Sequence, residues 1–332
     1  MRVLVTGGAG YIGSHVVRAL TEHGHDVVVI DDLSSGHQRA VGTAQLVIGD
    51  IRDASLVARV LADHPVDVAI HLAALKSPFE SLTDPGRYFD VNVTGTRVLV
   101  DGLMRAGVHA FVYSSSCAVY GIPERLPLDE ESVTRPTTPY GESKLMSERM
   151  LPWFGARGMS WAALRYFNAA GAAADGSIGE QWDAAINLIP VVLRATLGGG
   201  PPVRVFGSDY PTPDGTAVRD YIHVEDLAIA HVRAAERVLA GTEALILNLG
   251  TGMGSSVAEV ITAVEAATGR MVPHSVEERR PGDPAAVWAD PGRAQEALGW
   301  RATRGLSEIV LSAVAWHTSH PNGYAERSAE HP

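Results

Sequence analysis

Two side chains able to move a proton, Tyr140 and Lys144, lie four residues apart and follow an apolar run that ends in Ser114-Ser115-Ser116. Residues four apart share one face of a helix, so the phenol and the ammonium can reach the same ligand. Because a tyrosine has a reference pKa of about 10, it acts as a base near neutral pH only when positive charge stabilises the phenolate. The ammonium supplies that charge, and a serine at a strand end can relay the proton of a substrate hydroxyl. The pattern therefore predicts removal of a hydroxyl proton by Tyr140.

A glycine-rich turn over residues 7–13 follows the first apolar run and opens an amphipathic segment. Glycines at positions 7, 10 and 13 permit a tight turn, let backbone N–H groups approach a diphosphate and let a helix pack closely on the strand. Asp31 ends the second apolar run, 18 residues after Gly13. Its carboxylate suits the hydroxyls of an adenosine ribose and repels a 2′-phosphate, which favours NAD over NADP. Asp50 ends the third run, where an adenine would lie, and a plain turn is the competing interpretation there.

Short apolar runs alternate with helical patterns through the first half of the chain. Such runs, rich in Val and Ile and without polar alternation, are typical of strands buried on both faces of a parallel sheet. Their alternation with helices predicts an α/β fold with a doubly wound parallel sheet of the Rossmann type. We expect strands at 2–6, 26–30, 45–48, 67–71, 110–114 and 162–166, and helices at 12–22, 53–63, 86–106 and 140–157.

The composition of the sequence changes after Asn168, where Gly-, Ala- and Pro-rich stretches replace the alternation of predicted strands and helices. We expect an NAD-binding domain over residues 1–170, to which about 220–250 return as a helix at 220–238 and a strand at 245–249. The main part of 171–330 is expected to form a smaller, interleaved substrate lobe. The polar tail from about Asn322 has too little apolar content to pack.

Composition argues against several other classes of protein. The formal net charge of −11 repels phosphate backbones and no basic stripe opposes it, so we expect no nucleic-acid partner. No apolar run approaches the roughly 18 residues of a membrane span, so we expect no membrane association. The single cysteine, Cys117, cannot form an internal disulfide and suits a reducing cytoplasm. The 13 histidines form no His-Glu-x-x-His array, so we expect no bound metal.

Seven segments carry a resemblance to a known family. They are TGGAGYIGSH (6–15), SSSCAVYG (114–121), PYGESK (139–144), LRYFNAAG (164–171), DYPTPDGTAVRDYIHVEDLA (209–228), LNLGTG (247–252) and RRPGD..AVWAD (279–290). On these motifs nearly the whole chain resembles the extended short-chain dehydrogenase/reductase family and, within it, the UDP-glucose 4-epimerases. The long middle motif makes the match specific, because it is particular to nucleotide-sugar epimerases.

The resemblance implies an NAD-dependent isomerase that interconverts UDP-galactose and UDP-glucose through a transient 4-keto sugar. It implies that Tyr140 and Ser116 are the catalytic pair, and that Lys144 holds the nicotinamide ribose and lowers the pKa of Tyr140. The residues that it places against NAD are Gly7, Gly10, Tyr11, Ile12, Gly13, Asp31, Asp32, Asp50, Ile51, Leu72, Ala73, Ala74, Lys76, Asn92, Ser114, Tyr140, Lys144, Tyr166 and Phe167.

The same resemblance implies a UDP-sugar substrate whose nucleotide is held firmly while the sugar turns over. Arg219 and Arg280 would bind the diphosphate, since planar guanidinium groups match phosphate oxygens. Asp283 would bind the uridine ribose. The full set of implied substrate residues is Ser116, Tyr140, Asn168, Asn187, Leu188, Val203, Val205, Phe206, Arg219, Arg280, Asp283 and Val287. A homodimer built on helices around 92–106 and 140–157 is also implied.

The match departs from the family at the sugar pocket and leaves other interpretations open. Val287 stands where some members carry a tyrosine that excludes N-acetyl groups, which suggests that UDP-N-acetylhexosamines are also accepted. A 4,6-dehydratase needs a carboxylate beside the serine, and Ser116-Cys117-Ala118 provides none. A UDP-uronate 4-epimerase needs only a changed pocket and stays open as the main alternative. A non-catalytic NAD sensor is expected to have lost the Tyr140 and Lys144 pair.

The two lysines of the chain yield a first prediction. Of the 27 Lys and Arg residues, only Lys76 and Lys144 are lysines, and both fall beside the predicted nicotinamide site. An ammonium is compact, whereas a guanidinium is broad and planar, so arginine is a poor replacement in such a place. We expect Lys144→Arg to reduce epimerase activity far more than thermal stability, and Lys76→Arg to weaken NAD retention. Near wild-type turnover and NAD content in both variants would contradict this.

Overall fold

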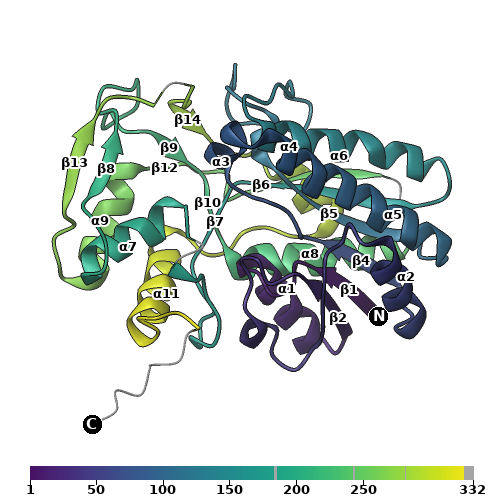
Figure 1. Ribbon diagram of the computed structural model, residues 1–332. Helices are drawn as coiled ribbons and strands as arrows, with labels where there is room; N and C mark the ends of the chain where they lie inside the picture. The colour runs from purple at the N-terminus through teal and green to yellow at the C-terminus, as the bar shows by residue number, and fades with distance from the viewer. Residues whose placement is uncertain (183–184, 242–243, 281, 325–332) are drawn as a thin grey trace, which may run out of the picture.

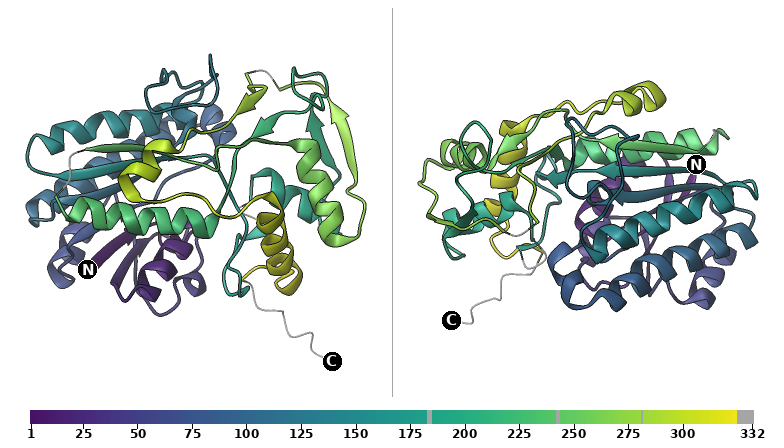
Figure 2. Two further views of the ribbon diagram at one scale, coloured as in Figure 1. Left: turned by 180° about the vertical axis from the view of Figure 1, so that it is seen from behind. Right: turned by 90° about the horizontal axis from the view of Figure 1, so that it is seen from above.

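The computed structural model describes residues 1–182, 185–241, 244–280 and 282–324. A seven-stranded parallel sheet forms the centre of the larger lobe, with helices on both faces (Figures 1 and 2). This arrangement confirms the predicted doubly wound α/β fold. In spatial order the strands are β11 (Leu245–Leu249), β6 (Ser160–Tyr166), β5 (Ala110–Ser116), β4 (Val68–His71), β1 (Arg2–Thr6), β2 (Asp26–Asp31) and β3 (Gln45–Ile48).

Two separate apolar cores lie on the two faces of this sheet. Because side chains alternate along a strand, Val3 and Val5 of β1 face one core and Leu4 faces the other, and all three are fully buried. The first core packs against α1 (Tyr11–Glu22) and α8 (Val224–Leu239). The second packs against α2 (Ala54–Asp63), α5 (Gly95–Arg105) and α6 (Pro139–Gly155).

A smaller lobe packs beside the carboxyl ends of the strands (Figure 1). Its core joins three helices to a pair of parallel strands and is lined by side chains such as Ile189, Val203 and Ile309. Its elements are β7 (Asn168–Ala170), α7 (Leu188–Leu197), β8 (Val203–Phe206), β9 (Val218–Arg219), β10 (Tyr221–His223), β12 (Ser255–Ser256), α9 (Val257–Thr268), β13 (His274–Glu277), β14 (Ala286–Val287) and α11 (Leu306–Ser319).

Short elements complete the connections between the two lobes and within the larger one. They are η1 (Gln38–Val41), α3 (Pro78–Thr83), α4 (Pro85–Tyr88), η2 (Phe89–Thr94), η3 (Cys117–Val119) and α10 (Gly292–Leu298). Among the described residues, no helix is long and apolar enough to cross a membrane.

Three expectations differ from the structure. The helix expected at 220–238 begins at Val224, because Tyr221–His223 pair with β7 as the strand β10. The helix expected at 86–106 is interrupted by a π-helical segment, η2, which places Asn92 inward. The tail was expected not to pack from about Asn322, yet the Tyr324 ring stacks on His37 with centroids 5.1 Å apart. The part of the expected 171–330 lobe beyond 324 lies outside the described residues.

Two buried histidines are neutral in the fold. The hydroxyl of Thr96 donates to the carbonyl of Asn92, so it accepts from His71 Nε2 at 2.9 Å, and His71 Nδ1 accepts from Thr6. His231 Nδ1 donates to the carbonyl of Leu227 at 2.9 Å, which leaves Nε2 to accept from Ser114 at 2.8 Å. Burial lowers the pKa of His71 to about 3 and that of His231 to about 4.

We expect the free energy of unfolding to decrease as the pH falls from about 6.5 toward 4. In this window the unfolded chain binds protons that the folded chain excludes. Each such histidine therefore lowers the free energy of unfolding by up to about 1.4 kcal/mol per pH unit. Urea unfolding at pH 7.5, 6 and 5 measures the slope. His231→Gln removes one of these groups and should make the slope shallower. A free energy of unfolding that is constant between pH 7 and 5 would refute the expectation.

Candidate active site

The glycine turn after β1 has the shape that a dinucleotide diphosphate requires. Gly7 has φ of +73°, and a Cβ there would lie 2.5 Å from the backbone nitrogen of Ala73. A Cβ at Gly13 would collide with the carbonyl oxygen of Gly7. No side chain caps the start of α1 at Gly10, so its first N–H groups face outward toward an anion. The residues present therefore fit NAD at this turn.

Acidic side chains lie at the ends of β2 and β3, the next two strands on one side of β1. Asp31, at the end of β2, is buried and accepts hydrogen bonds from the backbone of Ala9 and Leu33, both at 2.9 Å. Burial raises the pKa of Asp31, and these two hydrogen bonds oppose the rise. Asp32 accepts from Ser34 N at 2.9 Å. Asp50, expected near an adenine, is more exposed, and its hydrogen bonds with Arg52 lower its pKa.

Asn92 joins the segment after β4 to the catalytic helix. Its buried side-chain amide accepts from Leu75 N at 2.8 Å, donates to Leu75 O at 3.1 Å and donates to Ser143 Oγ at 2.9 Å. Ser143 lies on α6 between Tyr140 and Lys144. The segment Leu72–Lys76 is thereby fixed at the carboxyl edge of the sheet, which is the ligand side of this fold. Asn92 was expected to bind NAD. In the structure, its amide joins the segment after β4 to α6 next to the expected NAD site.

Tyr140, Ser116 and Lys144 converge where α6 packs against the end of β5. Thr138 caps α6 by accepting from Gly141 N at 3.2 Å, which places Tyr140 in the first turn. Ser116 is the last residue of β5 and lies close enough to the Tyr140 phenol to affect its pKa. The buried Lys144 Nζ donates to the carbonyl of Ser114 at 2.8 Å. The structure thus brings the three predicted catalytic residues together.

The pKa of Tyr140 differs from the sequence-based expectation. We expected Lys144 to lower it, but burial raises the pKa of Tyr140 to about 12, and the Ser116 hydroxyl opposes that rise only in part. Burial also lowers the pKa of Lys144 to about 7. Both shifts have the same physical cause, because a low-dielectric site disfavours charge on either group. The chain's own residues leave the phenol protonated, so added positive charge is required to make it a base.

A buried ion pair that the sequence analysis did not identify holds these elements in place. Arg165 Nη2 on β6 lies 2.6 Å from Glu148 Oε2 on α6, and both side chains are only 4% exposed. The hydroxyl of Ser115 on β5 also donates to Glu148. An arginine within the apolar run at 162–166 was the available signal, because a charge in a buried strand needs a partner. The pair fixes α6 against both strands.

The residues expected to bind substrate are divided between two places in the smaller lobe. Arg219 on β9 forms an ion pair with Asp283, which joins the expected diphosphate ligand to the expected ribose ligand. The guanidinium of Arg280 stacks on the ring of Phe206, 3.6 Å from its centroid. A cavity of about 320 Å³ lies beside this stack and is also lined by Trp182.

Other expected substrate residues lie near the junction of the two lobes. Asn187 precedes α7, which begins at Leu188, and its side chain approaches the carbonyl of Ala169 at 3.5 Å. Asn168 N donates to the carbonyl of Asp220 at 3.0 Å. The side chains of Val203 and Val205 are buried in the lobe's core.

Val287 belongs to an apolar cluster behind the catalytic helix. It is 7% exposed and lies in one cluster with Tyr120, Leu145 and Phe167. Cys117 packs at the edge of the same cluster, and burial raises the pKa of its thiol to about 12. Such a thiol stays protonated, which agrees with a packing role.

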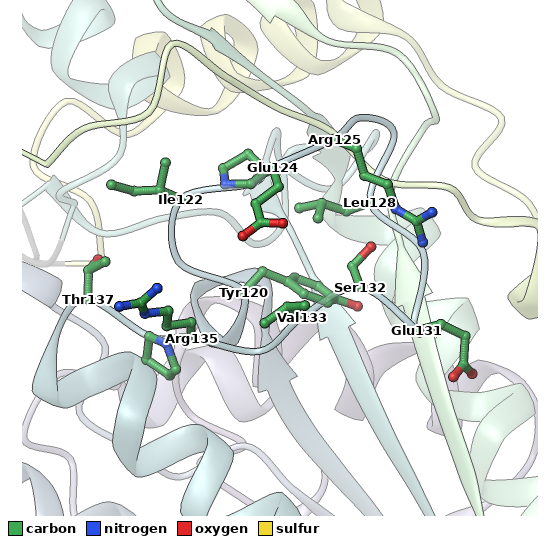
Figure 3. A pocket seen from close by; sticks show the side chains of 12 residues that line it. Tyr120, Ile122, Glu124, Arg125, Leu128, Glu131, Ser132, Val133, Arg135 and Thr137 are labelled. Atoms are coloured by element: carbon green, nitrogen blue, oxygen red, sulfur yellow. The ribbon is translucent and has the colours of Figure 1, made fainter.

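A second cavity, of about 700 Å³, lies under the loop that connects η3 to α6 (Figure 3). Its walls carry both signs of charge, including Glu124, Arg125, Glu131 and Arg135. Its lining contains none of the predicted catalytic or NAD-binding residues. The larger of the two cavities is therefore separate from the catalytic cluster.

Comparison with known proteins identifies the family. Residues 3–250 match the model of the NAD dependent epimerase/dehydratase family. The chain belongs to this family.

Relatives of this chain within the epimerase/dehydratase family match it almost from end to end. It is 46% identical over 339 residues to a UDP-glucose 4-epimerase of Azospirillum brasilense, covering 98% of this chain and 97% of the relative. The structure of the Bifidobacterium longum UDP-glucose 4-epimerase with NAD+ and UDP superposes with a TM-score of 0.92 at 40% identity, covering 98% and 100% of the two chains. That of the Campylobacter jejuni UDP-Glc/GlcNAc 4-epimerase superposes with a TM-score of 0.84 at 33% identity, covering 96% and 99%.

Proposed function

We propose that this protein is a UDP-glucose 4-epimerase, an isomerase that interconverts UDP-galactose and UDP-glucose with tightly held NAD. The observation that carries the proposal is the convergence of Tyr140, Ser116 and Lys144 beside a glycine turn shaped for a diphosphate. Identity above 40% to curated UDP-glucose 4-epimerases over nearly the whole chain supports the same activity. No observation favours a UDP-uronate substrate over a neutral sugar.

The catalytic cycle assigns one task to each residue of the cluster. Tyr140 removes the proton of the sugar 4-hydroxyl, and Ser116, which lies beside the phenol, shares that proton. NAD, when bound, accepts the hydride from C4 and returns it, and its positively charged ring supplies the charge that the phenolate needs. Lys144 holds the nicotinamide ribose. After the 4-keto sugar has turned to present its other face, Tyr140 returns the proton.

Turning the sugar requires strong contacts at the nucleotide and weak contacts at the hexose. We assign Arg219 and Arg280 to the diphosphate and Asp283 to the uridine ribose. The Arg219 and Asp283 side chains form an ion pair with each other. Because the pair already restricts both side chains, they lose little further rotamer freedom when a ligand binds. The remaining residues of the NAD and substrate sets keep the assignments that the family resemblance implies.

The assembly that we propose is a homodimer through α5 and α6. On α6, Met146 and Trp153 lie seven residues apart and are 39% and 76% exposed, whereas Leu151 on the opposite face is fully buried. Large exposed apolar side chains on one helix face are suited to a protein interface. Because the one cysteine, Cys117, cannot form an internal disulfide, a reducing cytoplasm is the proposed location.

We expect the purified protein to convert UDP-galactose into UDP-glucose without added reductant, because the hydride is returned in every turnover. Separation of the nucleotide sugars by chromatography at equilibrium measures this. Tyr140→Phe should reduce the rate by about 10²- to 10⁴-fold, since it removes the proton-transfer group but keeps the ring. Failure of the wild-type protein to form UDP-glucose, with bound NAD confirmed, would contradict the proposed activity.

We also expect turnover of UDP-N-acetylglucosamine or UDP-N-acetylgalactosamine. Val287 is smaller than the tyrosine of some family members, so a sugar pocket bounded by this residue would have room for an acetyl group. Val287→Tyr should lose activity on the acetylated sugars and retain activity on UDP-galactose. The hypothesis is wrong if the wild-type protein epimerises UDP-galactose but neither acetylated sugar.

A further inference from the structure

Glu180 is a buried carboxylate that none of the assignments above uses. It lies in the segment of the smaller lobe between β7 and α7, and its side chain is only 5% exposed. Among the described residues, the one hydrogen-bonding partner of the Glu180 carboxylate is Lys76 Nζ, at 3.4 Å. The Lys76 side chain is 44% exposed. Burying a carboxylate costs several kcal/mol unless its charge is paired. This arrangement therefore contributes little to the stability of the fold.

The ion pair of Lys76 and Glu180 connects the two lobes at the edge of the expected NAD site. Lys76 belongs to the segment after β4, whose Ala73 touches Gly7 of the glycine turn, and Asn92 fixes its neighbour Leu75. Burial raises the pKa of the Tyr11 phenol, and the negative charge of Glu180, from the other lobe, adds to that rise. Glu180 therefore lies beside both a lysine and a tyrosine of the expected NAD set.

Contacts around Glu180 fix its backbone. Its carbonyl accepts from Trp316 Nε1 at 3.0 Å. The neighbouring Gly179 N donates to the phenol of Tyr324 at 3.1 Å, and Tyr324 N donates to Gln181 Oε1 at 2.9 Å. Since the Tyr324 ring also stacks on His37, the backbone that carries the Glu180 carboxylate is joined to both lobes.

We propose that Glu180 is a positioning residue that holds the Lys76 ammonium at the edge of the NAD site, where the lysine would bind the negatively charged dinucleotide. This inference rests on the proposed NAD-dependent function. Lys76 then stands between two negative groups, the carboxylate and the diphosphate, and neutralises both. Without Lys76 the carboxylate would repel the dinucleotide, so Glu180 contributes to NAD retention only through the lysine.

The test compares NAD release from four proteins: wild type, Glu180→Gln, Lys76→Met and the double variant. Each is purified with its NAD, diluted, and assayed over time for dinucleotide still bound. Glu180→Gln should release NAD about tenfold faster than wild type, the effect of losing one partner of a charge pair. In the Lys76→Met background the same substitution should slow release, because it removes a repelling charge. This reversal of sign is not expected of a residue that only supports the loop.

Two controls separate positioning from loss of structure. Asp175→Asn breaks the exposed Arg18 ion pair, 2.7 Å long, that joins α1 to the same segment, and NAD release should not change. At saturating NAD, Glu180→Gln should keep its kcat and its KM for UDP-galactose within about twofold of wild type, since it leaves the catalytic cluster intact. Glu180→Asp keeps the charge and should give an intermediate release rate, which covers the case in which Glu180→Gln does not fold.

Release from Glu180→Gln at the wild-type rate, or effects of equal sign in both backgrounds, would overturn the assignment of Glu180. A low kcat of Glu180→Gln under saturating NAD would do the same. A wild-type protein that holds no NAD and forms no UDP-glucose would instead refute the proposed function. The two failures are therefore distinguishable.

Discussion

The packing of α6 against the carboxyl end of β5 is the constraint on which the whole active site depends. Lys144 on α6 donates a hydrogen bond to the carbonyl of Ser114 on β5. One turn later, the ion pair of Glu148 with Arg165 holds the helix against β6. A buried ion pair contributes little net stability, but breaking one side of it is costly. Its value here is geometric, because it fixes Tyr140 within reach of Ser116.

The same burial that fixes this geometry determines the chemistry. A dry site raises the pKa of the Tyr140 phenol and lowers that of the Lys144 ammonium, so neither charge is favoured in the protein alone. A tyrosine in this state is a poor base until a positively charged group enters the site.

The junction of the two lobes combines polar contacts with a small apolar cluster. The larger lobe buries its apolar side chains on the two faces of its sheet, and the smaller lobe has a core of its own. Between them lie the cluster that contains Leu145 and Val287, the ion pair of Lys76 with Glu180, and the hydrogen bond from the Tyr11 phenol to the carbonyl of Gly171 at 2.7 Å. Binding groups can therefore be recruited from both lobes without disturbing either core.

The local patterns of the sequence were sufficient to predict the sheet, the glycine turn and the convergence of Tyr140, Ser116 and Lys144. Buried parallel strands have continuous apolar runs, and a dinucleotide turn needs glycine where a Cβ would collide, so both leave a signal in neighbouring residues. Tertiary structure alone decided the partners of isolated charges, such as Arg165 with Glu148 and Glu180 with Lys76. It also decided the packing of Tyr324 and the direction of the pKa shift of Tyr140. These depend on which distant segments exclude water from a group, and no spacing along the chain encodes that.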